Sequence, residues 1–268
     1  MINKFQIVIS TTSSRLASAI EIAETFFSKT EIESLIVCQI HDSLKDKEVL
    51  LENCMGYKVL YSYDKGLARS RNVGLFCSSA EIVWMLDDDV EVQVDAALEA
   101  FNYLDKHKEL DFLTSKFEIE GGDSYKNYKS DCGFHDLLSV LKVSSIELFL
   151  RRKSVLEKGI TFDTRFGLGA SFPSGEENIL LTDLIRRDAK GIYLPVVTST
   201  HPDISSGWRL DGRDNAFAKG AMLKRIFGFW SYFIVPVFYL KKVNEKRLSI
   251  YQACSCILNA VRAAFYFK

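Results

Sequence analysis

Short apolar runs alternate with amphipathic segments along most of the chain. Runs rich in β-branched and aromatic residues predict buried strands at 5–9, 35–40, 57–61, 82–86, 111–118, 146–150 and 191–198. Apolar residues at three- and four-residue spacing predict helices at 15–28, 95–108 and 151–158, and a further helix opens after residue 64. Because strand, helix and strand follow one another at the N-terminus, the pattern indicates an α/β fold with a parallel βαβ start.

The predicted strand at 82–86 ends in three consecutive carboxylates, Asp87, Asp88 and Asp89. In open α/β sheets, ligands bind at the carboxyl ends of the strands. Adjacent carboxylates raise one another's pKa unless a cation compensates, and Mg²⁺ or Mn²⁺ usually keeps positions for water and substrate phosphates. The cluster therefore predicts a metal-assisted site for a nucleoside diphosphate, with an ordinary acidic turn as the alternative.

Polar side chains also follow the first two predicted strands. Ser10, Thr11 and Thr12 are placed either to cap the next helix or to contact the base or ribose of a nucleotide. Gln39, near the end of the second strand, offers a donor and an acceptor to a base edge. We expect these side chains, together with Asp88, to be nucleotide contacts.

The third predicted strand leads into a helix whose first turns are basic. Lys65, Arg69 and Arg71 lie there, with Gly66 for a tight turn and Asp64 as the expected cap. Positive charge at a helix start has the wrong sign for the helix dipole, but an anionic ligand would offset that cost. We therefore expect these cations to face phosphate oxygens; a solvated basic face is the alternative.

Composition narrows the function classes further. The chain has 268 residues, 47% of them hydrophobic, and a formal net charge of -1, so it can bury a large core and shows no electrostatic footprint for nucleic acid. Its six cysteines lack CxxC spacing, which favours reduced thiols in a cytosolic protein over a zinc site or disulfides. No secretory signal is evident at the N-terminus.

Segments 64–74 and 82–90 together resemble the nucleotide-sugar half of family-2 glycosyltransferases. That family has the GT-A fold, a Rossmann-like mixed sheet flanked by helices, and a Gly-x-x-x-x-Arg-Asn segment that precedes a strand ending in Asp-x-Asp. Here those residues are Gly66, Arg71, Asn72, Asp87 and Asp89. The resemblance implies that Asp87 contacts the ribose or the metal and that Asp89 ligates the metal bound to the diphosphate. Family members commonly have Asp residues where this chain has Gln39, and these residues read the uracil ring. The identity of the nucleobase therefore stays open.

A second acidic pair, Glu176 and Glu177, opens a predicted helix after the glycine-containing loop 166–169. Carboxylates in a first turn stabilise a helix through its dipole, and this capping role is the alternative to a catalytic one. The family has a Glu-Asp pair here, and its second acid is taken as the base that removes the acceptor's hydroxyl proton. The resemblance implies Glu177 as base and Glu176 as a sugar or acceptor contact, with exchange of roles left open.

His201 follows the predicted strand at 191–198. Many GT-A enzymes complete the metal or diphosphate site with a downstream histidine, so we expect His201 to join Asp87 and Asp89 as a ligand of Mn²⁺ or Mg²⁺. A packed or exposed histidine is the alternative. Segment 205–209 is expected to close over the donor.

The last part of the chain is different in character. Segment 226–240 is uncharged and rich in Phe, Trp and Tyr, and Lys and Arg residues flank it. It is shorter than the about 20 apolar residues that span a bilayer, which favours an interfacial segment at the inner leaflet. A helical cap packed on the core or on another subunit is the alternative, and it also applies to the apolar helix expected at 248–267.

Together with these patterns, the resemblance to family-2 glycosyltransferases of the bacterial cell-surface polysaccharide type implies a GT-A α/β catalytic domain at 1–210, with a donor half at about 1–118 and an acceptor half at about 130–210. An apolar helical segment, 211–268, follows it. The expected function is an inverting, metal-dependent glycosyltransferase, with UDP as the expected nucleotide, that uses a saccharide or lipid-linked acceptor in polysaccharide or lipid-linked oligosaccharide synthesis. It is expected in the cytoplasm, either free or peripheral at the inner face of the cell membrane. A nucleotidyltransferase and a non-catalytic nucleotide-sugar-binding protein are the alternatives.

Overall fold

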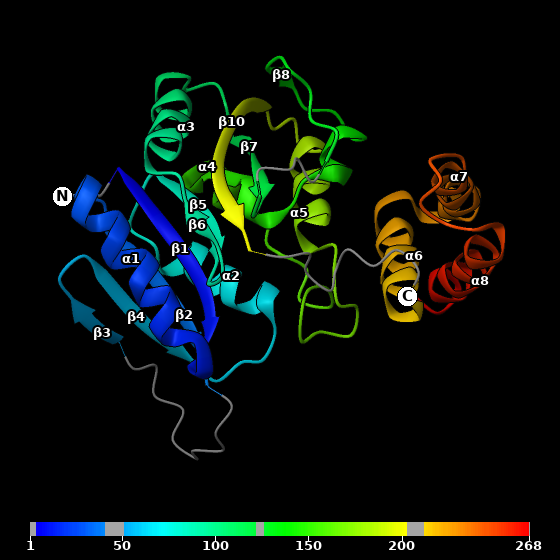
Figure 1. The fold of residues 1–268 in the computed structure, drawn as a ribbon, viewed down its shortest axis with the longest axis horizontal. Coiled ribbons are helices and arrows are strands. Elements are labelled where there is room, and N and C mark those ends of the chain that lie inside the picture. The colour runs from blue at the N-terminus through cyan, green and yellow to red at the C-terminus, as the bar shows by residue number, and fades with distance from the viewer. Residues whose placement is uncertain (1–3, 41–50, 122–125, 203–211, 268) are drawn as a thin grey trace.

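The computed structural model describes residues 4–40, 51–121, 126–202 and 212–267 of the chain (Figure 1). Its strands are β1 (Phe5–Thr12), β2 (Ser34–Gln39), β3 (Leu51–Cys54), β4 (Tyr57–Ser62), β5 (Ile82–Asp87), β6 (Glu91–Val92), β7 (Phe112–Ile119), β8 (Gly133–Phe134), β9 (Leu148–Arg151) and β10 (Gly191–His201). Its α-helices are α1 (Leu16–Thr30), α2 (Leu67–Cys77), α3 (Val94–Lys106), α4 (Arg152–Glu157), α5 (Glu176–Ile185), α6 (Arg213–Phe227), α7 (Ser231–Asn244) and α8 (Ile250–Tyr266).

The described strands form one mixed sheet in the order β3-β4-β2-β1-β5-β9-β7-β10-β6, with β8 paired to β10. Strands β4, β2, β1 and β5 run parallel, while β9 runs antiparallel between β5 and β7. Since side chains alternate along a strand, Ile7 and Ile9 pack toward α1 and α3, whereas Val8 packs toward α2 and α5. Apolar residues on both faces explain why the parallel strands have continuous hydrophobic runs.

The strand register brings the predicted strand ends to one edge of the sheet. Ser10 of β1 lies opposite Asp87 of β5, and Thr12 lies opposite Gln39 of β2. Strand β1 is longer than its apolar run because the polar residues 10–12 continue its ladder with β2. Strand β10 likewise continues to His201, which pairs with the end of β7. The polar ends of β1, β2, β5 and β10 therefore lie at the same edge, as the sequence predicts.

The start of α2 differs from the prediction. Gly66 occupies the N-cap position at φ +124°, and no side chain caps the helix, so Asp64 is not its cap. A residue with a β-carbon is strained at this φ, which explains the glycine. The N–H of Leu67 donates to the carbonyl of Leu168 at 2.9 Å, and this bond ties the first turn to the loop before α5.

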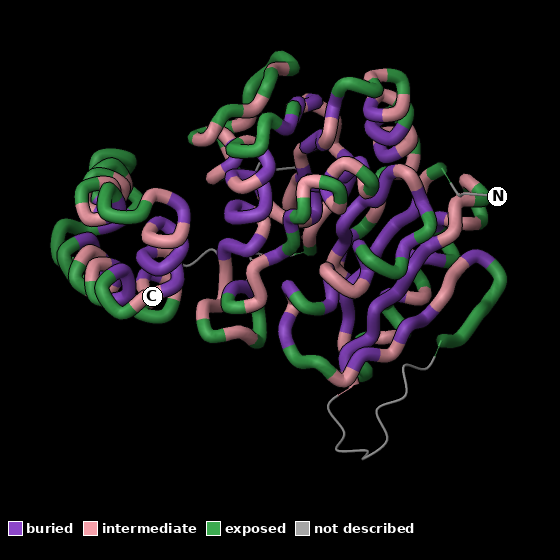
Figure 2. The backbone as a smooth tube through the Cα atoms, turned by 180° about the vertical axis from the view of Figure 1, so that it is seen from behind, coloured by how far each residue is buried: buried purple, intermediate pink, exposed green. Residues whose placement is uncertain are grey.

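The C-terminal helices form a third apolar cluster, which also includes Phe166 and Ile179 from the region around α5. A β-carbon on Gly220 of α6 would lie 2.0 Å from the carbonyl oxygen of Ala260 in α8, so these two helices touch backbone to backbone. Helix α6 also packs on α5, since a β-carbon on Gly175 would lie 2.8 Å from Met222 Sδ. Figure 2 shows the exposed residues of α7 and α8 on their outer side.

By length and composition alone, Arg213–Asn244 could cross a membrane, with a mean hydropathy of 1.3 and 33% of its most apolar window buried. Buried core helices of soluble proteins share this length and composition. The chain takes φ +56° at Gly228, α6 ends at Phe227, and α7 begins at Ser231 after a short 3₁₀ turn. The predicted apolar segment 226–240 is therefore the end of one helix and most of the next.

Candidate active site

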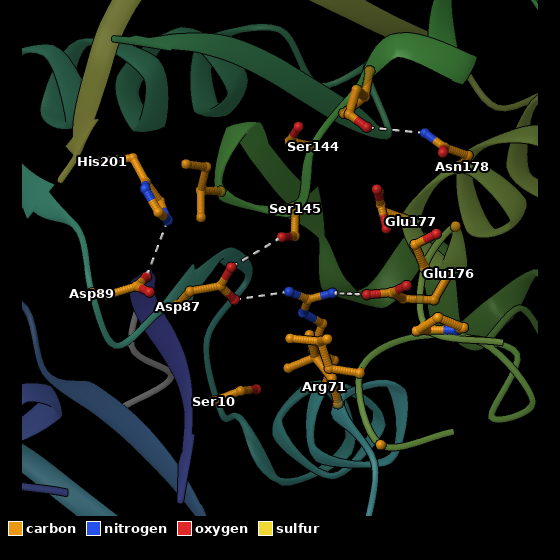
Figure 3. A pocket seen from close by; sticks show the side chains of 18 of the residues that line it. Ser10, Arg71, Asp87, Asp89, Ser144, Ser145, Glu176, Glu177, Asn178 and His201 are labelled. Carbon is orange, nitrogen blue, oxygen red and sulfur yellow. Dashed lines mark hydrogen bonds and ion pairs between the residues drawn. The ribbon is translucent and has the colours of Figure 1, made fainter. Parts of the chain in front are cut away.

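A cavity of about 510 Å³ lies at the carboxyl edge of the sheet. Figure 3 shows the strand ends, the start of α2 and the first turn of α5 in its wall. The loop before α5 and the inner side of α6 and α7 also line it. The predicted site residues that line it are Ser10, Thr11, Thr12, Gln39, Lys65, Arg71, Asp87, Asp88, Asp89, Glu176, Glu177 and His201. The fold thus brings the strand-end acids and the helix-start acids of the sequence to one cavity.

The guanidinium of Arg71 is buried between two carboxylates from different elements. One Nη lies 2.8 Å from Asp87 Oδ1 at the end of β5, and the other lies 2.5 Å from Glu176 Oε1 in α5. Charge-assisted hydrogen bonds of this length are strong, and a buried charge requires them. Arg71 therefore joins the end of β5 to the start of α5, and two of its nitrogens already have acidic partners.

Asp87 and Asp88 differ in their surroundings although they are neighbours. Asp87 accepts from Arg71 and, at 3.4 Å, from the hydroxyl of Ser145. Asp88 accepts a 2.5 Å hydrogen bond from the Thr11 hydroxyl and lies 3.1 Å from Arg15. Burial raises the pKa of Asp88, and the contacts with Thr11 and Arg15 act against that rise. Asp88 is thus already bound by protein groups.

Asp89 faces a third direction, toward His201. Its Oδ1 lies 3.5 Å from His201 Nε2, and its Oδ2 lies 3.3 Å from Arg15. The interaction with His201, followed by that with Arg15, holds the pKa of Asp89 below its usual range, against the effect of burial. Asp89 is therefore kept in its charged form.

The predicted metal ligands do not all converge. Because β5 ends at Asp87 and the chain turns at Asp88, Asp87 faces Arg71 while Asp89 faces His201. Within the described ranges, no group of three or more His, Cys, Asp and Glu side chains is arranged to hold a metal ion. Asp89 and His201 fit a cation, since a buried carboxylate oxygen beside an imidazole is a donor set that Mn²⁺ accepts. The remaining ligands would have to come from water and diphosphate, as is usual for such ions.

Three predicted nucleotide contacts have distinct roles at the sheet edge. The Oε1 of Gln39 accepts from the N–H of Gly66 at 2.8 Å, so the amide NH₂ of Gln39 is the group left for a ligand. The Ser10 hydroxyl is buried, with no hydrogen-bond partner among the described residues. The Thr12 hydroxyl lies 3.0 Å from that of Ser14. This part of the cavity therefore offers donors and hydroxyls at the place expected for a base and ribose.

Three further residues that we expected at the nucleotide lie outside the cavity lining: Gly66, Arg69 and Asn72. Arg69 is exposed. An α-helix turns by about 100° per residue, which places Arg69 on the side of α2 opposite Leu67 and Arg71. Both ends of the Asn72 amide pair with the backbone of Phe162, at 2.8 and 2.9 Å. Gly66 is buried against the loop before α5. Asn72 and Gly66 therefore fix the shape of the site from behind its wall.

The helix-start acids are not equivalent. Glu176 is buried and paired with Arg71, and Gly167 approaches it so closely that a β-carbon there would lie 3.0 Å from Glu176 Cδ. Glu177 is half-buried and lines the cavity. Burial and the charge of Glu176 raise the pKa of Glu177 to about 8, against the opposing charges of Arg71 and Lys219. A carboxylate with a raised pKa has the proton affinity that a base needs near neutral pH.

Several lining residues were not expected as site residues from the sequence. Arg15 lies between Asp88 and Asp89, although its place after a run of hydroxyls suggested only a helix start. Asn215 and Lys219 of α6 and Phe238 and Tyr239 of α7 come from the segment that we expected to be an appendage. The predicted segment 205–209 lies outside the described residues.

No protein-family model matches the chain, and no curated protein matches it significantly. Among solved structures, residues 1–349 of S. aureus TarS in complex with UDP-GlcNAc are similar, with a TM-score of 0.64 and 15% identity over 97% of this chain and 81% of that one. The complex of the same region with UDP gives a TM-score of 0.59 at 16% identity, over 97% and 82% of the two chains. Against the longer TarS structure the TM-score is 0.62, and half of that chain is covered.

This likeness shows the fold. At such low identity it does not extend to the activity or to single residues. The predicted α/β class, a mixed sheet flanked by helices as in GT-A-like structures, is confirmed. Membership of family 2 stays a prediction.

Proposed function

We propose that the chain is an inverting, metal-dependent glycosyltransferase that moves a sugar from a nucleoside diphosphate, with UDP as the expected nucleotide, to an acceptor hydroxyl. The observation that supports it best is one cavity with acids of opposite character on two walls. Asp89 beside His201 is held in its charged form, whereas Glu177 has a raised proton affinity. A fold of the same kind binds UDP-GlcNAc and UDP in TarS.

On the donor side, Asp89 and His201 would hold the cation. When bound, the cation supplies positive charge that stabilises the diphosphate as it leaves. Arg15 offsets the negative charges of Asp88 and Asp89 and orients both carboxylates. The amide NH₂ of Gln39 can donate to a base carbonyl, an acceptor that uracil has on its edge.

On the acceptor side, Glu177 takes the proton of the acceptor hydroxyl as its oxygen attacks the anomeric carbon. The new bond from that carbon to the acceptor oxygen forms as the bond to the diphosphate oxygen breaks, and a single in-line displacement inverts the configuration. Arg71 positions Glu176 beside the base through their 2.5 Å ion pair. The sugar lies, in this proposal, between Glu177 and the strand-end acids, against Leu168 and Gly169 of the preceding loop.

The acceptor in this proposal is a saccharide or a lipid-linked saccharide, met at the inner face of the cell membrane. Helix α7 and the turn before it expose an apolar stripe made of Trp230, Phe233, Val237 and Leu240, each more than half exposed. Exposed cations follow it at Lys241, Lys246 and Arg247. Aromatic side chains beside cations favour a lipid headgroup region with anionic charge, and the inner side of α7 lines the cavity.

Vesicle sedimentation tests the membrane part of the proposal. We expect the wild type to bind vesicles with anionic lipid more strongly than zwitterionic ones, and Phe233→Ser with Val237→Ser to abolish binding. Met55→Ser, which removes another highly exposed apolar side chain, is the control and should bind as the wild type does. If the stripe variant instead splits a dimer and no vesicle binds, the surface is a protein interface and the membrane role fails.

Calorimetric binding of UDP, GDP and their sugar conjugates, with and without Mn²⁺, tests the donor site. We expect one diphosphate to bind in a metal-dependent manner, and Asp89→Ala to abolish that dependence. Glu99→Ala removes an exposed carboxylate on α3 and is the matched control. If no nucleotide binds under any metal condition, the strand-end acids are acidic surface and the proposed function fails.

A further inference from the structure

The C-terminal helix α6 contributes to the wall of the cavity that contains the proposed base. Asn215 and Lys219 lie on its inner side, one turn apart, and both line the cavity together with Glu177. The charged terminus of a lysine rarely lies inside a protein without an acidic partner. An acidic side chain in the cavity wall is therefore expected near Lys219.

The surroundings of Lys219 are largely apolar. Its Nζ lies 3.9 Å from Met222 Sδ and 5.9 Å from the centre of the Phe238 ring. Burial lowers the pKa of Lys219, and the nearby cations Lys242 and Lys126 act in the same direction. The charge of Glu177 acts against them and favours the charged lysine. Among the described residues whose charges act on Lys219, Glu177 is the one of opposite sign.

The charge balance around Glu177 explains what this lysine supplies. Three carboxylates, Asp87, Glu176 and Glu177, lie around the single guanidinium of Arg71, which makes its ion pairs with the first two. Glu177 thus shares Arg71 with two closer acids. Lys219 is the second cation that lowers its pKa, and it reaches the group from a different element, α6.

We propose that Lys219 is a positioning residue that supplies the counter-charge for Glu177 and holds it as a carboxylate able to accept a proton. The inference rests on the proposed function, in which Glu177 is the base. It makes α6 part of the catalytic unit instead of an appendage to it.

The packing of α6 fixes the direction of Lys219. Arg225, on the same helix, pairs with Asp183 of α5 at 2.7 Å, and Met222 fits against Gly175 at the start of α5. Lys219 lies one turn before Met222, on the side of α6 that faces α5 and the cavity. The helix that presents the lysine is thus held to the helix that presents the base.

Titration of Glu177 in the substrate-free full chain tests this pairing directly. The carboxyl carbon is followed by NMR in protein labelled with ¹³C at glutamate Cδ, and Glu177→Gln identifies the signal. In Lys219→Met we expect the pKa of Glu177 to rise by about one unit, since removing an opposite charge favours the protonated form. Lys219→Arg should restore the wild-type value. Lys224→Met, which removes another cation from α6 outside the cavity lining, should leave it unchanged.

Activity gives the second measurement. In Lys219→Met, the rise of kcat/KM with pH should move to higher pH by the same interval, with a loss of about tenfold at pH 7 that disappears at high pH. A Glu177 pKa that is equal in wild type and Lys219→Met overturns the proposal, and so does a loss of activity that is the same at every pH. If the wild type transfers no sugar, the proposed function fails, whereas the titration still decides whether Lys219 and Glu177 are paired.

Discussion

At the end of β5, each of three carboxylates has a cation or a hydroxyl within about 3.5 Å, whereas at the start of α5 Arg71 pairs directly with only one of two. The pKa of Asp89 is lowered by His201 and Arg15, while that of Glu177 is raised to about 8 by burial and by Glu176. The two clusters consist of the same functional group and face the same cavity.

The difference shows how one site handles both charge and protons. An acid that is paired with cations keeps its negative charge and suits a metal or a phosphate-bearing donor. An acid that is desolvated beside another acid holds a proton more tightly and suits proton transfer. Titratable groups whose pKa values are pushed apart by their environments mark the acid and base roles in an active site.

The largest expected effect comes from removing the proposed proton acceptor. Glu177→Gln should lower kcat by about 10² to 10⁴-fold, the range for loss of a general base, and leave the Kd for the nucleotide diphosphate unchanged. Transfer assays and calorimetry on the same preparation measure the two quantities. Full turnover in this variant would show that the pair only caps α5. A wild type that binds the donor but never turns over would favour the non-catalytic binding protein.

Removing the cation that joins the two clusters is the next largest effect. Arg71→Met leaves Asp87 and Glu176 without their shared buried partner, so the free energy of unfolding should fall by about 3 to 5 kcal/mol. Urea unfolding measures it. Arg69→Met removes an exposed cation from the same helix and should stay within about 0.5 kcal/mol of the wild type. Equal effects for the two variants would contradict the role assigned to Arg71.

The third expected effect is a pH dependence of opposite sign for the two clusters. In the folded chain the pKa of Glu177 is about 8 against an ordinary 4.5, so the folded state retains a proton that the unfolded state has released between these values. Stability should therefore fall as pH rises from about 4.5 to about 8 in the wild type. Glu177→Gln should lack this fall.

Asp89 shows the reverse linkage. Its folded pKa lies below the ordinary 3.8, so its contribution is present above pH 3.8 and is lost as pH falls through the folded value. Asp89→Asn should differ most from the wild type at neutral pH and least in acid. Thermal unfolding across the pH range measures the stability of both variants relative to the wild type. If that difference in stability changed with pH in the same direction for both, the two clusters would not differ as described.

The sequence predicts much of the sheet because buried parallel strands have their own composition. The same reasoning misses β3, whose four residues are all exposed, since an exposed strand lacks an apolar run. It predicts a helical segment over 211–268 but gives no bounds for α6, because the sequence at Arg213–Phe227 is mixed in character. Helix α6 ends where Gly228 takes φ +56°, and the residues around Gly228 do not predict that conformation.

The site is predictable where its residues follow strand ends. Asp87, Asp89 and Gln39 reach the cavity because parallel strands end at one edge. Arg15 and Lys219 reach it through tertiary packing between segments far apart in the sequence, and no local pattern records such contacts. The opposite directions of Asp87 and Asp89 depend on a turn at Asp88, which the alternation of a strand does not predict.

The contact of Gly220 with the carbonyl of Ala260 limits how the C-terminal helices can move. At this point no side chains separate the two helices. A rotation of α6 about its own axis would therefore displace α8 as well. The pair should therefore move as one rigid unit.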